Sequence, residues 1–182
     1  MNRWEGRVAL VTGATAGIGR AVAVALHAAG MRVVACGRRQ AQLDALTAEL
    51  GDERLFAVQC DLRKEEDILA MFKAVADRWQ GVDVCVNNAG LGVNASLMDG
   101  ATEGWRQMLD VNVLALAICA RESLSHMKVK GVNDGVIINI SSMSAHRVVA
   151  PLTMYSATKH AVKAMTEGLR QELRIAGSGN RV

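Results

Sequence analysis

The stretch RVALVTGATAGIG, residues 7–19, decides the fold. Its apolar first half predicts a short strand that stops at Gly13, and the Ala- and Val-rich residues 20–30 predict a helix ended by Gly30. A strand, a glycine-rich turn and a helix in this order are typical of a dinucleotide-binding unit. Glycines permit the tight turn and let backbone amides approach a pyrophosphate, which the helix N-terminus stabilises. A plain structural turn is the alternative, and we favour the binding unit because both flanking elements are present.

The second predicted strand, residues 32–36, bears on the choice of cofactor. A unit that prefers NAD generally carries an acid near the end of this strand, where the acid binds the ribose 2′-hydroxyl. Here the strand is followed by Gly37, Arg38 and Arg39. A guanidinium pairs well with a 2′-phosphate, so the sequence favours NADP(H). Arg38 is the better candidate because it lies nearest the strand end, and two solvated arginines opening a surface helix are the alternative.

Strands and helices alternate along the rest of the chain. Further strands are predicted over residues 55–60, 82–86 and 135–140, and further helices over 40–50, 64–79, 101–130 and 155–176, the last interrupted by Gly168. This alternation predicts an α/β fold, a doubly wound parallel sheet of the Rossmann type with right-handed crossovers. The length of 182 residues fits a single domain over residues 1–182.

Composition narrows the class of protein. Apolar residues make up 51% of the chain but aromatic residues only 3%, so the core must be aliphatic. The formal net charge of +3 is slight and scattered, which argues against a nucleic-acid groove. No apolar run approaches membrane length, and we expect no signal peptide. The four cysteines form no CxxC pair, so we expect small buried core residues, no metal site and a reducing compartment, the cytoplasm.

Several polar or small residues fall where predicted strands end. Ligands of doubly wound sheets bind beyond the carboxyl ends of the strands, and Gly13, Asp61, Asn88 and Ser142 all lie at such ends. Asp61 could accept a hydrogen bond from an adenine amino group, or cap the helix that follows it. The run of residues 87–90, Asn-Asn-Ala-Gly, suits either a close backbone approach to a ligand or a structural turn.

Tyr155 and Lys159 lie four residues apart in a predicted helix and therefore on one face. An ammonium beside a phenol favours the ionised phenolate, so this phenol could give or take a proton. Ser142 could hydrogen-bond a carbonyl oxygen at the same point. Chance placement on an ordinary helix is the alternative, and the cofactor unit aimed at the same place outweighs it. Asn112 lies mid-helix among apolar residues, where it would bend the helix, hold a water or simply face solvent.

Together these residues resemble the short-chain dehydrogenase/reductase family over the whole chain. The matching motifs are Thr12-Gly13-x-x-x-Gly17-x-Gly19, Asn87-Asn88-Ala89-Gly90, Asn112, Ser142 and Tyr155-x-x-x-Lys159. Residues 2–4, 66–69 and 166–173 resemble a branch of the family that acts on keto- and hydroxysteroids or, in insects, on farnesol.

The resemblance implies an NADP(H)-dependent oxidoreductase that interconverts a ketone or aldehyde and an alcohol by hydride transfer. Tyr155 would be the general acid/base, and Lys159 would favour its ionised form and hold the nicotinamide ribose. Ser142 would orient the carbonyl, and Asn112 would support a water in the proton relay. The implied cofactor contacts are Gly13, Thr15, Gly17, Ile18, Gly19, Arg38, Arg39, Asp61, Leu62, Asn88, Ala89, Gly90, Val111, Tyr155 and Lys159. The helices that hold Asn112 and Tyr155 would form the interface of a homodimer or homotetramer.

Two features depart from the family pattern. Ala145 stands where the family often has glycine, three positions after the serine. The chain ends at Val182, where family members begin a sixth strand and continue into a segment over the nicotinamide, a substrate lid and a seventh strand. We therefore expect the fifth strand to be an exposed edge, and these residues to bind cofactor weakly and turn over little substrate. The alternative is a catalytically silent chain that acts only by pairing with other subunits.

Overall fold

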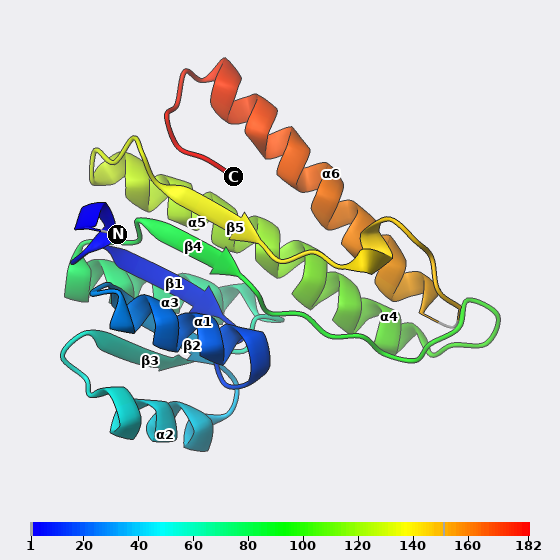
Figure 1. Cartoon of the computed structure of the whole chain (residues 1–182). Coiled ribbons are helices and arrows are strands. Elements are labelled where there is room, and N and C mark those ends of the chain that lie inside the picture. The colour runs from blue at the N-terminus through cyan, green and yellow to red at the C-terminus, as the bar shows by residue number, and fades with distance from the viewer. Residues whose placement is uncertain (1, 151) are drawn as a thin grey trace.

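Parallel strands form a single sheet in the order β3-β2-β1-β4-β5 among the residues that the structure describes, 2–150 and 152–182 (Figure 1). The structure is a computed structural model of the chain. The strands are β1 (Val8–Thr12), β2 (Arg32–Gly37), β3 (Leu55–Gln59), β4 (Val84–Asn87) and β5 (Val136–Asn139). Strand order reverses between β1 and β4, which is the point where doubly wound sheets open a crevice for ligands. The predicted fold class is confirmed.

Helices connect the strands in the predicted alternation. They are α1 (Gly17–Ala28), α2 (Gln40–Leu50), α3 (Glu65–Trp79), α4 (Thr102–Leu109), α5 (Ala115–Val129) and α6 (Thr153–Ile175), with short 3-10 turns η1 (Asn2–Trp4) and η3 (Met143–Ala145). A π-helical segment, η2 (Asp110–Leu114), joins α4 to α5. The predicted interruption of the last helix at Gly168 is wrong, because α6 runs through this residue unbroken. One glycine costs a helix only about 1 kcal/mol relative to alanine, and a helix of this length tolerates that cost.

The two faces of the sheet carry separate apolar clusters. Along β1, Val8 and Leu10 point into a cluster shared with α3 and α5, while Ala9 and Val11 point into a cluster shared with α1 and α2. This is the period-two alternation of a strand covered on both faces. All four cysteines are buried and free, as expected for small core residues. Burial raises the pKa of the Cys85 thiol to about 12.

The outer edge of β5 is partly covered, against the expectation of an exposed edge strand. Arg181 forms a parallel bridge to Val136, its N–H donating to the Gly135 carbonyl at 2.9 Å. The Arg181 carbonyl in turn accepts from the N–H of Ile137 at 2.8 Å. These bonds satisfy the first residues of β5, whereas Ile138 further along remains 44% exposed. Within residues 2–150 and 152–182, no helix has both the length and the apolar character needed to cross a membrane.

Candidate active site

The glycine turn after β1 is shaped by contacts that leave no room for a side chain. Gly13 has φ +67°, and a Cβ there would lie 2.9 Å from the Cα of Ala89. A Cβ on Gly19 would collide with the Asn88 amide nitrogen and with the Gly13 carbonyl. Packing against residues 88 and 89, which follow β4, therefore requires glycine at both positions, whether or not a ligand also requires it.

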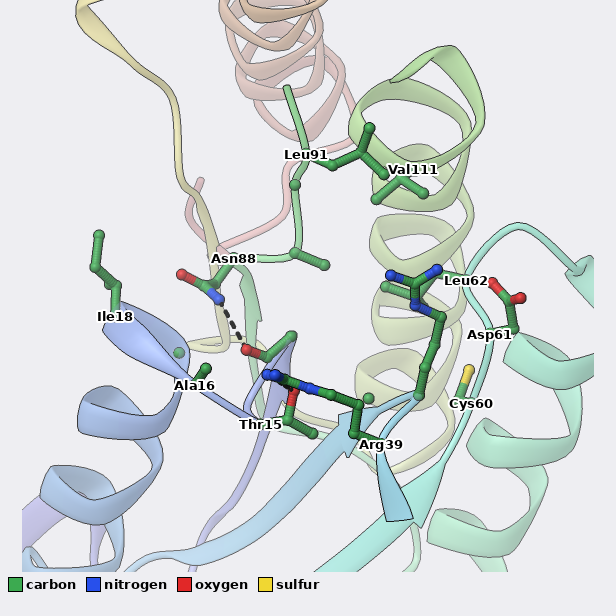
Figure 2. A pocket seen from close by; sticks show the side chains of 16 residues that line it. Thr15, Ala16, Ile18, Arg39, Cys60, Asp61, Leu62, Asn88, Leu91 and Val111 are labelled. Atoms are coloured by element: carbon green, nitrogen blue, oxygen red, sulfur yellow. Dashed lines mark hydrogen bonds between the residues drawn. The ribbon is translucent and has the colours of Figure 1, made fainter. Parts of the chain in front are cut away.

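Hydrogen bonds lock this turn to the end of β4. The Thr12 hydroxyl oxygen accepts from the backbone N–H groups of Asn88 and Ala89, both at 3.0 Å. The Asn88 side chain donates to the Thr12 carbonyl at 2.9 Å and, more weakly, to the Gly13 carbonyl at 3.4 Å. The dashed line in Figure 2 starts at this Asn88 amide. Asn88 thus stabilises the conformation of the glycine turn by bonding its carbonyl groups.

A cavity of about 480 Å³ opens in front of this turn, at the reversal of strand order. It has the size typical of small-molecule sites. Predicted cofactor residues that line it are Gly13, Thr15, Ile18, Gly19, Arg38, Arg39, Asp61, Leu62, Asn88, Ala89, Gly90 and Val111. The predicted residues Gly17, Tyr155 and Lys159 do not line it. Sequence reasoning missed four lining residues, Ala16, Gly37, Cys60 and Leu91. Each is a direct neighbour in the sequence of a residue that was predicted.

The two arginines after β2 lie in different parts of the cavity. The Arg39 side chain turns toward the glycine loop and donates to the Thr15 hydroxyl at 3.0 Å (Figure 2). The charge of Arg38 acts on Asp61 and helps to lower the pKa of that carboxyl. Both arginines are exposed, whereas Gly37 is buried, and a Cβ there would lie 2.5 Å from the Thr15 methyl group. An acidic side chain at position 37 would therefore have to displace Thr15.

Asp61 already has a cationic partner in this structure. The Arg63 guanidinium donates to its two carboxylate oxygens, at 3.0 Å from Nε and 2.5 Å from Nη2. Mainly through this hydrogen bonding, Arg63 holds the pKa of the Asp61 carboxyl down at about 2. The alternative that Asp61 caps the following helix is wrong, because α3 begins after Lys64 with no side-chain cap. Its carboxylate instead accepts the Arg63 backbone N–H at 3.1 Å, closing a short turn.

Tyr155 and Lys159 lie beside the cavity on the first turns of α6. The Lys159 ammonium is 5.9 Å from the centre of the Tyr155 ring and donates to the Ile140 carbonyl at 2.9 Å. Lys159 is only 4% exposed, and this burial lowers the pKa of its ammonium. A Cβ on Gly90 would lie 3.5 Å from the Lys159 ammonium, and one on Gly92 would lie 3.5 Å from the Tyr155 ring. The segment that leaves β4 thus connects the cavity to both side chains.

Ser142 and Asn112 belong to segments that pack against α6. Ser142 precedes η3, which packs against α6, and its hydroxyl accepts the Ser144 N–H at 3.1 Å. Ala145, the departure from the family pattern, is buried, so its methyl group has a place in the packing. Asn112 is buried in the π-helical segment, contrary to the solvent-facing alternative. Its side chain bonds Leu91 in both directions, accepting from the N–H and donating to the carbonyl, each at 2.9 Å. π-helical turns of this kind occur frequently at functional sites.

A second groove, of about 430 Å³, lies between α5 and α6. Its walls are mainly apolar, with Arg121 and Glu172 as charged members and Asn139 of β5 among its lining residues. These two helices are the ones expected to carry a subunit interface.

Comparison with known proteins matches this arrangement to one family. The family described as short chain dehydrogenase matches residues 7–177. Dehydrogenase/reductase SDR family member 11 of Gallus gallus is 54% identical, over 97% of this chain and 71% of its own length. Farnesol dehydrogenase of Aedes aegypti is 46% identical, over 98% of this chain and 75% of its own length. The closed form of serine dehydrogenase complexed with NADP+ matches with a TM-score of 0.89 and 36% identity, over 96% of this chain and 69% of that chain.

Proposed function

The chain belongs to the short chain dehydrogenase family, and we propose that it is an NADP(H)-dependent oxidoreductase that interconverts a ketone or aldehyde and an alcohol. The observation that carries this proposal is the shared wall formed by residues 88–92. On one side it borders the cavity at the glycine turn, and on the other it lies against Lys159 and Tyr155. A nicotinamide cofactor, when bound, would supply or accept the hydride.

The glycine turn supports binding of a pyrophosphate. Residues of this turn line the cavity at the start of α1, where the helix N-terminus favours an anion. The arginines after β2 support a preference for NADP(H) over NAD(H). Arg38 and Arg39 both line the cavity, and within it a 2′-phosphate would meet guanidinium groups rather than an acid at position 37. Serine dehydrogenase, matched above, is described with NADP+ bound.

The proton chemistry is assigned to Tyr155. Its hydroxyl would donate a proton to the carbonyl oxygen during reduction and accept it during oxidation. Lys159 would favour the phenolate by its charge and hold a ribose hydroxyl, and Ser142 would hydrogen-bond the carbonyl oxygen. Asn112 would support a water in the proton relay. The two side-chain amide hydrogens of Asn112 are donated to the Leu91 carbonyl and the Thr158 hydroxyl. The water would therefore be held by atoms of this turn other than the Asn112 amide nitrogen.

An apolar substrate fits the side chains around the catalytic turn. Met143 and Val148, on the segment between Ser142 and α6, are 79% and 58% exposed. Exposed apolar side chains beside a reaction centre favour an apolar ligand over a charged one. A steroid-like or isoprenoid carbonyl compound has this character, and farnesol dehydrogenase is among the relatives.

We further propose that the protein is a homodimer or homotetramer that pairs through α5 and α6. The apolar groove between these helices would be buried by the same groove of a second subunit. Sedimentation of the purified chain tests this point, since a monomer at micromolar concentration contradicts it.

Titration of the purified chain with NADPH, followed by cofactor fluorescence, tests the proposed function together with NADPH oxidation in the presence of an isoprenoid aldehyde or a steroid ketone. We expect saturable but weak binding of NADPH, still weaker binding of NADH, and slow consumption of NADPH that depends on the carbonyl compound. Lys159→Met should impair both binding and turnover. Lys163→Met, which changes an exposed lysine one turn beyond Lys159, is the matched control and should behave like the native chain. Binding without turnover on any carbonyl compound would favour a catalytically silent chain, and failure to bind either cofactor would refute the proposal.

A further inference from the structure

Thr158 is a buried polar residue with no assigned role, between Tyr155 and Lys159 on α6. It is 1% exposed, and both capacities of its hydroxyl are used. The hydroxyl donates to the Tyr155 carbonyl at 2.7 Å, and its oxygen accepts from the Asn112 side chain at 3.0 Å. The turn of α6 that carries the phenol is therefore tied, through one hydroxyl, to the π-helical segment.

The other end of this connection reaches the cavity. Asn112 bonds Leu91 in both directions at 2.9 Å, and Leu91 lines the cavity next to Val111 (Figure 2). A continuous chain of hydrogen bonds thus runs from the cavity wall at Leu91, through Asn112 and Thr158, to the backbone of Tyr155. Asn112 and Thr158 are each 1% exposed, so water does not compete for these bonds from the surface. Buried hydrogen bonds of this kind hold geometry more tightly than exposed ones.

We propose that Thr158 is a positioning residue for the reaction, which sets where the Tyr155 phenol lies relative to the cavity. It touches neither the substrate nor the cofactor, and it acts through the Tyr155 carbonyl and Asn112. Its hydroxyl is the junction at which the cavity wall and the catalytic turn are fixed to each other. Without that junction, α6 and the segment after β4 can shift relative to each other, and proton transfer is sensitive to shifts below 1 Å.

A purely structural role for the hydroxyl is the competing interpretation, and the same helix contains a comparator. The Thr166 hydroxyl donates to the Val162 carbonyl at 2.7 Å and accepts from the Asn139 side chain at 3.0 Å. Thr166 therefore makes the same two kinds of bond as Thr158, from the same helix, to an asparagine on another element. It lies two turns further on, away from Tyr155. A general effect on the packing of α6 should appear at both threonines, and a positioning effect only at Thr158.

The single tyrosine of the chain makes a direct test possible. A chain labelled with 13C only at the tyrosine ring carbon that bears the hydroxyl gives one resonance, which reports the surroundings of Tyr155 and requires no turnover. Thr158→Val removes both hydrogen bonds and keeps the shape of the side chain. If that variant does not fold, Thr158→Ala replaces it, since the smaller side chain leaves room for a water beside Asn112. We expect a shifted or broadened resonance in either variant, a native position in Thr158→Ser, and no change in Thr166→Val.

Kinetics provide the second measurement, and this arm rests on the proposed function. We expect Thr158→Val or Thr158→Ala to lower kcat by about 10-fold or more, with KM and NADPH affinity within about 2-fold of native. Thr158→Ser should restore most of kcat, and Thr166→Val should change neither constant. A native resonance in Thr158→Ala, or equal losses of kcat at both threonines, would overturn the inference. If the native chain turns over no carbonyl compound, the proposed function fails, while the tyrosine resonance still decides the role of Thr158.

Discussion

The proposed cofactor side of the site is interlocked, whereas the proposed substrate side presents exposed apolar side chains. On the cofactor side, defined by the glycine turn and residues 88 and 89, a methyl group at Gly19 would strike backbone and the Asn88 amide. On the substrate side, defined by residues 143–149, Met143 and Val148 are more than half exposed. Asn112 and Lys159 are buried, and a Cβ on Gly90 would lie 3.4 Å from the Asn112 side-chain oxygen and 3.5 Å from the Lys159 ammonium. Packing within the chain thus fixes the geometry of the proposed cofactor site and of the proposed proton donor, Tyr155. The proposed substrate-facing surface carries none of that constraint.

Tyr155→Phe gives the largest expected effect and separates the two sides. It removes one hydroxyl and leaves the packing of the ring against Gly92 intact. Since general acid/base groups contribute about 10²–10⁴-fold to rate, we expect turnover to fall by at least about 100-fold. NADPH affinity, measured by cofactor fluorescence, should stay near native. Substantial turnover in the phenylalanine variant over a range of pH would contradict the assignment of Tyr155 as the acid/base.

Gly19→Ala should have the opposite effect, because it should abolish cofactor binding rather than the proton-transfer step. The added methyl group must displace the Asn88 side chain or the Gly13 carbonyl. Overpacking of this kind costs about 1–3 kcal/mol of unfolding free energy. We expect a lower denaturation midpoint in urea and little or no NADPH binding.

Gly90→Ala is the matched control for that variant. A Cβ at position 90 meets nothing closer than the Asn112 side-chain oxygen at 3.4 Å, and Gly90 is exposed. Its urea midpoint should stay close to native, with at most a modest change in NADPH affinity. If the two glycine variants lose stability equally, the interlocked cofactor side is not the special region described here.

The sequence alone predicted most of the residues that line the cavity at the glycine turn, because local rules determine their positions. Glycines between a strand and a helix, and small or polar residues at strand ends, indicate the turn and the sheet edge without knowledge of packing. The partner of Asp61 could not be predicted in this way. Arg63, two residues further on, binds the Asp61 carboxylate and would compete with an adenine amino group for it. Only the course of the backbone between the two residues shows that the guanidinium reaches the carboxylate.

Contacts between distant segments account for the other differences. The pattern around Gly168 gave a helix break because intrinsic propensity was considered without the continuous helix around it. The link from Leu91 through Asn112 to Thr158 joins three separate segments, so no spacing in the sequence reveals it. On the substrate side, exposed apolar residues follow no period that would indicate a ligand.

Arg38→Ala should affect the two cofactors differently. Loss of one charge-assisted hydrogen bond typically costs about 1.5–3 kcal/mol, which corresponds to a loss of roughly 10- to 100-fold in NADPH affinity. NADH lacks the 2′-phosphate and should lose little. Arg39→Ala, the neighbouring control, also removes the bond to Thr15 and should weaken both cofactors to some degree. Equal losses of NADPH and NADH in Arg38→Ala would refute the phosphate assignment and remove the preference for NADP(H).

The ion pair of Asp61 and Arg63 gives the smallest expected effect, and it appears as a dependence of stability on pH. The pKa of Asp61 is held at about 2 in the folded chain, against about 3.9 for an unfolded aspartate. A carboxyl with a depressed folded pKa stabilises the fold above the unfolded value, and that contribution is lost as pH falls from about 4 to about 2. Arg63 is 37% exposed, so solvent screens the pair and we expect only a small contribution to stability.

Arg63→Gln should therefore lower the unfolding free energy at pH 7 slightly and flatten its decline between pH 4 and pH 2. Urea denaturation at several pH values measures both effects. The matched control is Arg170→Gln on α6, because the Glu167 pKa is likewise held at about 2 by hydrogen bonds from Arg170 and Gln171. That pair is more exposed, at 55% for Arg170 and 51% for Glu167, and its loss should change stability less than the loss of Arg63 does. If Arg170→Gln costs as much as Arg63→Gln, partial burial at the cavity rim adds nothing to the Asp61 pair. An ion pair at the cavity would then stabilise the fold no more than an ion pair elsewhere on the surface.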